Sequence, residues 1–144
     1  MNKKNGTEAT RLRDYGNEPT VVNIDLFTKE NPYYRTAFWT GDYLQLTLMS
    51  IKVGGDIGIE MHPDTDQFIR VESGYALVKM GDSEDNLTLC QKVNDNYAIL
   101  VPAGTWHNII NLGDAPLKLY SIYAPPHHPF GTVHKTKEDA HKLE

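Results

Sequence analysis

The sequence is poor in cysteine and has no long hydrophobic run. Its single cysteine, Cys90, excludes an internal disulfide and agrees with a reducing compartment. No apolar run approaches the ~18 residues that cross a bilayer. The basic residues near the start are followed by no apolar segment of the kind that a secretory signal requires. We therefore predict a cytoplasmic protein with no membrane partner.

The sequence also has no excess of basic residues. The chain has 14 Lys and Arg residues against 19 Asp and Glu residues, which gives a formal net charge of −5. Proteins that bind nucleic acid through its phosphates usually show the opposite balance. We expect no nucleic-acid partner and a small molecule as the ligand.

The length of 144 residues leaves room for one domain of the usual size, ~100 to 200 residues. Residues 1–16 are polar and follow neither a helical nor a strand period, which predicts a mobile or partner-swapped arm. Residues 17–124 form the expected folded domain. Residues 125–144 form a tail that contains prolines and histidines, and we expect this tail to be a lid over the site or an arm across a dimer.

Helical patterns are scarce, and most of the chain alternates short β-branched or aromatic runs with Gly, Pro, Asn and Asp. The helix candidates are residues 26–31 and 135–144. We predict strands at residues 20–24, 35–40, 43–53, 57–62, 67–72, 75–80, 87–93, 98–101, 106–111 and 117–123. Many short strands without intervening helices predict an all-β fold, a small closed β-barrel with a mouth, since closure removes exposed strand edges.

Four polar residues on these strands have the composition of a metal site. Period-two alternation places Glu60 and His62 on one face of a strand. Gln67 begins the inward-facing set of the next strand, and a turn at residues 102–106 leads to His107. Two imidazoles and two oxygen donors suit a metal ion. Taken singly, a histidine is more often a hydrogen-bonded or surface residue than a metal ligand, and Glu60 and Gln67 are also typical of a solvated strand residue and of a satisfied core amide.

Residues 55–111 resemble the cupin superfamily. The glycine, His-x-His, carboxylate and glycine of its first motif correspond to Gly55, Glu60, His62, Gln67 and Gly74. The glycine, Pro-x-Gly, histidine and asparagine of its second motif correspond to Asn96, Pro102, Gly104, His107 and Asn111. The resemblance implies a jelly-roll fold, the double-stranded β-helix.

Three positions depart from the cupin pattern: Glu60 replaces a histidine, Gln67 replaces a glutamate and Asn96 replaces a glycine. The first two changes move the carboxylate from one ligand position to another and preserve the charge of the site. The third is mild, because asparagine tolerates positive φ better than other non-glycine residues. With Glu60, His62, Gln67 and His107 as ligands, the resemblance implies a divalent ion, and this donor set suits Zn, Mn, Fe or Ni.

The chain resembles the small cupins that are likened to mannose-6-phosphate isomerase. This resemblance implies metal-dependent isomerisation of a small sugar, sugar phosphate or related hydroxycarbonyl compound. Glu60 is either a metal ligand or, if it is not on the metal, the catalytic base with a raised pKa. A metal-dependent dioxygenase and a non-catalytic cupin that binds a small molecule are the alternatives.

Further side chains are candidates for contacts with the substrate or with a partner. Those expected at the substrate are Tyr123, Trp106 and His127, although aromatic residues in strands also serve as core or interface. Basic residues considered for a phosphate are Arg35, Arg70 and Lys79. The resemblance also implies a homodimer, for which the apolar candidates are Phe38, Trp39 and Phe68.

Overall fold

The computed structural model describes residues 11–142, so residues 1–10 of the predicted arm and 143–144 of the predicted tail lie outside the described residues. The described chain is mostly β, as predicted. Its elements in chain order are α2 (Ile24–Glu30), β1 (Arg35–Thr40), β2 (Gln45–Ile51), β3 (Asp66–Ser73), β4 (Tyr75–Gly81), β5 (Leu89–Asn94), β6 (Ala98–Val101), β7 (Trp106–Asn111), β8 (Leu117–Ala124), β9 (Val133–His134) and α3 (Lys137–Lys142).

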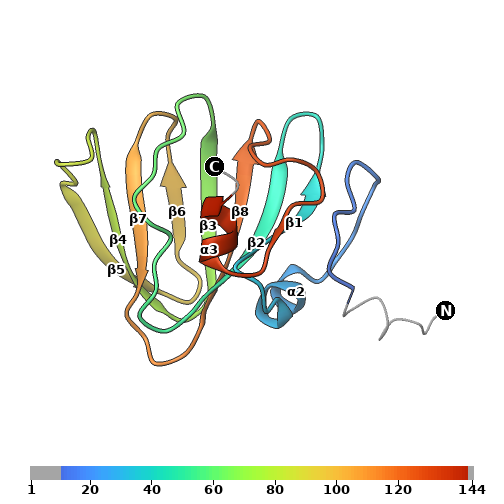
Figure 1. Ribbon diagram of the computed structural model, residues 1–144, viewed down its shortest axis with the longest axis horizontal. Helices are drawn as coiled ribbons and strands as arrows, with labels where there is room; N and C mark the ends of the chain where they lie inside the picture. Colours follow the sequence, from blue (N-terminus) through green and yellow to red (C-terminus); the bar gives the residue numbers. More distant parts are fainter. Residues whose placement is uncertain (1–10, 143–144) are drawn as a thin grey trace.

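The strands form two antiparallel sheets (Figure 1). The larger sheet has the order β6-β3-β8-β2-β1-β9, and the smaller has the order β5-β4-β7. Residues of both sheets, such as Leu119 of β8 and Ile109 of β7, meet in one buried apolar cluster. This arrangement is consistent with a jelly-roll sandwich. Where a closed barrel was expected, the strands of residues 11–142 pair into two sheets.

Two predicted strands are wrong. Residues 20–24 form no strand because the Asn23 side chain accepts a hydrogen bond from the backbone N–H of Leu26 (3.1 Å) and caps α2, which begins at Ile24. Residues 57–62 form only an isolated bridge to β7, at Glu60, since Gly58 has a φ of +82° that interrupts a regular strand. Strand β9 was not predicted, because two residues carry too little pattern.

The inward face of the larger sheet changes from apolar to polar along its strands. Met49 of β2 and Leu119 of β8 are register neighbours and are fully buried. Further along the same strands, the neighbours Gln45, Tyr123 and Gln67 are equally buried but polar. Buried polar groups require partners or a ligand. A binding site is therefore expected at this end of the sandwich.

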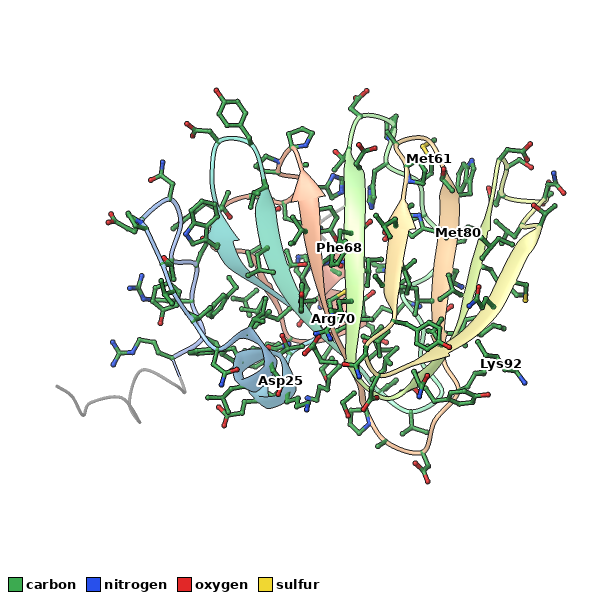
Figure 2. The ribbon with its side chains drawn as sticks, turned by 180° about the vertical axis from the view of Figure 1, so that it is seen from behind. Asp25, Met61, Phe68, Arg70, Met80 and Lys92 are labelled. Carbon is green, nitrogen blue, oxygen red and sulfur yellow. The ribbon has the colours of Figure 1, made fainter. Side chains whose placement is uncertain are left out.

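The outer face of the same sheet has an apolar row across its strands. Cross-strand neighbours in this outer row are Trp39, Leu46, Ile122, Phe68 and Leu100. Figure 2 shows Phe68 and Arg70 along β3, two positions apart and therefore on the same face of the strand. At its β6 end the row is open, because Leu100 is 65% exposed.

The N-terminal part of the described chain covers the other end of this face. Phe38 packs there with Phe27 and Leu48 in a second buried cluster, and the Tyr15 ring meets the Phe38 ring edge-on at 5.2 Å. Phe38 is 1% exposed. It belongs to the core of its own chain and is not available for the predicted dimer contact.

The C-terminal segment returns to the domain of its own chain. Strand β9 pairs with β1, and Ala140 of α3 is buried in the main core. The Lys137 ammonium lies 2.5 Å from the Asp56 carboxylate and fixes α3 to the loop after β2. The longest helix of the described residues, α2, has seven residues, and none is long and apolar enough to cross a membrane.

Candidate metal centre

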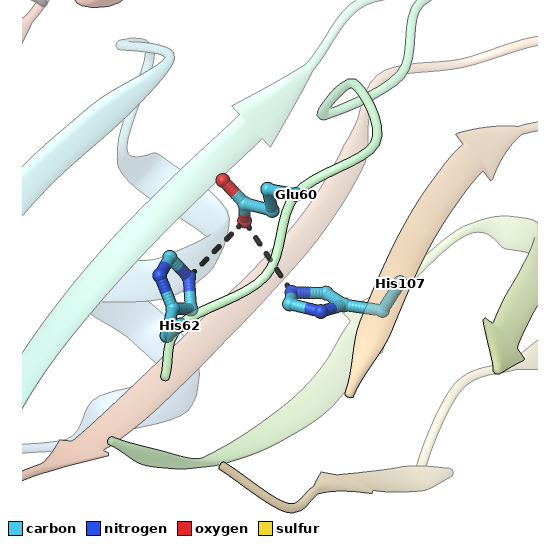
Figure 3. A group of neighbouring side chains, drawn as sticks. All are labelled: Glu60, His62 and His107. Atoms are coloured by element: carbon cyan, nitrogen blue, oxygen red, sulfur yellow. Dashed lines mark ion pairs between the residues drawn. The ribbon is translucent and has the colours of Figure 1, made fainter. Parts of the chain in front are cut away.

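Glu60, His62 and His107 come together at the polar end of the sandwich (Figure 3). The loop between β2 and β3 carries Glu60 and His62, and β7 carries His107. The backbones of Glu60 and His107 exchange two hydrogen bonds, of 3.0 and 2.9 Å. This antiparallel bridge sets the two side chains against each other, and period-two alternation then brings His62 to the same face as Glu60.

The turn before β7 also fixes this geometry. Gly104 has a φ of +84°, and its N–H donates to the His62 carbonyl at 2.9 Å. A residue with a Cβ is strained in this conformation, which explains the glycine of the second motif. Asn96 has a φ of +76° and is the only non-glycine residue with positive φ among the described residues. This conformation agrees with the expectation that asparagine takes the place of the motif glycine with little strain.

The three side chains offer ligand atoms that all lie within 4.8 Å of one another. The Glu60 Oε2 atom lies 3.5 Å from His62 Nε2 and 3.4 Å from His107 Nε2. His62 is 8% and His107 1% exposed, whereas the Glu60 side chain is half-buried. A carboxylate oxygen between two imidazole nitrogens, at distances too long for good hydrogen bonds, leaves room for an ion.

The hydrogen bonds of His107 agree with this role. Its Nδ1 lies 3.0 Å from the Thr105 carbonyl oxygen, which only accepts, so Nδ1 carries a proton and Nε2 is the nitrogen that faces Glu60. Both Nε2 atoms, of His62 and His107, are buried without a hydrogen bond of good geometry. Buried nitrogen atoms that face a carboxylate are stabilised when a proton or a metal cation lies between them and the carboxylate. The residues present therefore fit a divalent metal ion.

Glu60 is ionised in this environment. Burial alone would raise its pKa, but the imidazoles of His107 and His62 have the stronger combined effect and hold the pKa of Glu60 well below its usual range. The raised pKa that a catalytic base would need is not found. A charged carboxylate is the form that binds a metal ion.

Gln67 is a further oxygen donor at the polar end of β3. It is 5% exposed and, as expected, faces the interior with Ile69. Its Nε2 atom donates to Ser121 Oγ at 3.2 Å, whereas its Oε1 atom is buried with no hydrogen-bond partner. The amide oxygen therefore has a free lone pair with which it could bind a metal ion.

Two of the residues that we expect to contact the substrate lie next to the histidine pair, His62 and His107. The His127 ring centroid lies 4.1 Å from that of His62, and the Tyr123 ring centroid lies 5.8 Å from it. Trp106 precedes His107 on β7 and lies on the opposite face of that strand, so the structure does not bring it to the pair.

The sequence analysis missed Gln45, which holds the segment that carries His127. Its Oε1 accepts hydrogen bonds from the backbone N–H groups of His127 (3.1 Å) and His128 (2.9 Å), and its Nε2 donates to the His128 carbonyl (2.8 Å). Gln45 is fully buried. The sequence held a signal for this role. Gln45 shares the inward face of its strand with buried residues such as Met49, and a glutamine on a buried face is unusual.

The fold and the site define the class of protein. Residues 47–123 match the family model of the cupin domain. This match covers more than half of the chain, and the chain belongs to the cupin family.

Three known proteins are similar to this chain. The uncharacterized protein YrkC of Bacillus subtilis (strain 168) is 62% identical over 129 residues, which are 90% of this chain and 69% of YrkC. The uncharacterized protein L612 of Acanthamoeba polyphaga mimivirus is 44% identical over 118 residues, 81% of this chain and 72% of L612. The crystal structure of BH2720 from Bacillus halodurans matches with a TM-score of 0.90 and 62% identity, over 90% of this chain and 98% of that one.

Proposed function

We propose that this protein is a metal-dependent cupin that isomerises a small sugar, sugar phosphate or related hydroxycarbonyl compound, in the manner of mannose-6-phosphate isomerase-like cupins. The observation that carries the proposal is the group of Glu60, His62 and His107, with one ionised carboxylate and two buried, unpartnered imidazole nitrogens. The ligand set is completed by Gln67, whose amide oxygen is also unpartnered.

The donor set determines which chemistry the centre supports. A divalent ion bound by one carboxylate and neutral donors keeps a net charge of +1, and it supplies a Lewis acid that stabilises negative charge on the oxygen of a carbonyl compound. Glu60 holds its charge at neutral pH, which favours its role as a ligand over that of a base. Tyr123 and His127 border His62 and contact the substrate.

The proposed activity is tested by proton exchange. Metal-loaded protein is incubated in D₂O with short aldoses, ketoses and their phosphates, and NMR follows deuterium uptake at the carbon next to the carbonyl group. We expect uptake together with interconversion of an aldose and a ketose, loss of both in His107→Ala, and no change in His141→Ala, whose imidazole is exposed on α3. Oxygen consumption would instead indicate a dioxygenase, and binding without exchange would indicate a non-catalytic cupin; either result overturns the proposal.

We also propose that the chain forms a homodimer through the open end of the outer apolar row. Leu100 is the most exposed member of this row and lies beside Phe68. We expect Leu100→Lys to convert the dimer to a monomer, because a charge in an apolar contact is costly. Light scattering after size exclusion measures this. Leu89→Lys, at a 43% exposed leucine of β5, is the control, and a monomeric natural protein or a dimeric Leu100→Lys variant would contradict the assignment.

A further inference from the structure

Arg35 is a buried positive charge without a carboxylate partner. It lies on β1 and is 5% exposed, yet none of the ion pairs between the described residues includes it. Other buried charges are satisfied: Glu72 pairs with Arg70 at 2.5 Å, and the Asp14 carboxylate accepts three hydrogen bonds. An unpaired buried guanidinium is costly to stability, and Arg35 is the exception that requires an explanation.

Part of the hydrogen-bonding capacity of Arg35 is unused. A guanidinium has five N–H donors in a planar fork. Nη1 of Arg35 makes a hydrogen bond with His134 Nδ1 at 3.2 Å, the guanidinium also interacts with the Tyr123 phenol, and its central carbon lies 5.3 Å from the centre of the Tyr34 ring. Its Nε atom is buried without a hydrogen-bond partner. This fork matches the oxygen atoms of a carboxylate or a phosphate.

Further unpartnered polar atoms surround the same point. Thr47 Oγ1 and His128 Nε2 are both buried without a hydrogen-bond partner. Tyr123 joins this group to the metal centre. Burial raises the pKa of its phenol and the Arg35 guanidinium lowers it, with burial the larger effect. The Tyr123 ring lies 5.2 Å from that of His128 and 5.8 Å from that of His62. Tyr123 therefore lies beside both His128 of the Arg35 group and His62 of the metal centre.

When a divalent ion is bound, the charges of the metal centre and of Arg35 do not balance. Glu60 contributes −1 and Arg35 contributes +1, and the imidazoles that bind a metal are neutral. A divalent ion adds +2, so that the interior carries a net charge of +2. Buried charge of one sign calls for a counter-ion, and a ligand with one or two negative charges supplies it.

We propose that Arg35 binds the anionic group, a carboxylate or a phosphate, of the compound whose carbonyl end lies at the metal centre. The statement about the carbonyl end rests on the proposed function, whereas the anion site rests on Arg35 and its unpartnered neighbours. Because Tyr123 lies beside both His128 and His62, a compound that reaches both points is short. The substrate class narrows to short hydroxycarbonyl acids and sugar phosphates.

The test is carried out on metal-free protein, so that it examines the binding of an anion by Arg35 and its unpartnered neighbours without the charge of the ion. Inorganic phosphate and acetate are titrated separately, and NMR follows the Nε–H signals of the arginine side chains. We expect the Arg35 signal to shift and to saturate with one anion or both, while the signal of Arg70, which is paired with Glu72, stays in place. The anion that saturates the signal at the lower concentration identifies the chemical class.

Two variants complete the test. We expect Arg35→Met to bind the anion about tenfold more weakly or worse by calorimetry, and to melt at the same or a higher temperature without anion, because it removes an unpaired buried charge. Arg35→Lys keeps the charge but loses the fork and should bind with intermediate affinity. An Arg35 signal that ignores both anions, or equal binding by Arg35→Met, would overturn the site. Neither result affects metal binding, so the two proposals fail separately.

Discussion

Replacing His107 by alanine is expected to lower the affinity for a divalent ion by about 100-fold or more. The loss of a partner that merely orients a ligand already costs roughly 10- to 100-fold, and His107 is itself a candidate ligand. Its ring is 1% exposed, its Nε2 lies 3.4 Å from the Glu60 carboxylate, and its proton is held on Nδ1 by the Thr105 carbonyl. Another side chain has no space to replace it without repacking the core.

The measurement is metal content by plasma mass spectrometry, on protein purified without a histidine tag or chelating resin, followed by competition with a chelator. His141→Ala removes an imidazole from the exposed side of α3 and controls for the loss of a histidine as such. We expect one ion per chain in the natural protein and in this control. The double variant His62→Ala/His107→Ala should carry none.

Each outcome has a consequence for function. Zinc or manganese would agree with isomerisation, whereas iron, copper or nickel would favour oxygen chemistry. A natural protein that stays metal-free after incubation with each ion would refute the metal centre together with both catalytic hypotheses. The protein would then be expected to bind an organic ligand in place of a metal ion.

Replacing Gln45 by leucine is expected to lower the free energy of unfolding by about 2–4 kcal/mol. The variant leaves the backbone N–H groups of His127 and His128 without their acceptor, and an unsatisfied buried donor costs about 1–3 kcal/mol. It also removes the hydrogen bond from the amide nitrogen to the His128 carbonyl. The segment that places His127 against His62 then loses its attachment to β2.

Urea unfolding gives the stability change, and hydrogen exchange of the His127 and His128 amides reports on the segment itself. The matched control is Gln91→Leu, because Gln91 is exposed on β5 and its replacement should change stability by less than ~0.5 kcal/mol. If both amides exchange as slowly in Gln45→Leu as in the natural protein, the glutamine does not hold the segment.

Much of this protein follows from neighbouring residues alone. Strand alternation predicted that Glu60 and His62 share a face, and it also predicted that Gln67 faces the interior, because successive side chains of an extended chain point to opposite sides. The positive φ of Asn96 likewise follows from its place in the motif and from local sterics. Local patterns also predicted most of the strands.

Local reasoning failed where segments compete or where a boundary depends on one side chain. Residues 20–24 are rich in β-branched residues, but the cap formed by Asn23 commits the chain to a helix from Ile24. The pairing of strands into two sheets rather than one closed barrel is decided by long-range hydrogen bonds. Strand propensity carries no information about which edges meet.

The sequence by itself determined the all-β class, the motif residues and the carboxylate–imidazole composition of the site. Only the tertiary structure decided that Glu60 stays ionised, because its pKa depends on burial and on two imidazoles from different segments. It likewise decided that Gln45 holds a segment 82 and 83 positions away, and that Arg35 is buried and forms no ion pair with another of residues 11–142. The sequence specifies each side chain, but the electrostatic environment of a buried group depends on which charges and polar groups the fold places beside it and on the exclusion of water.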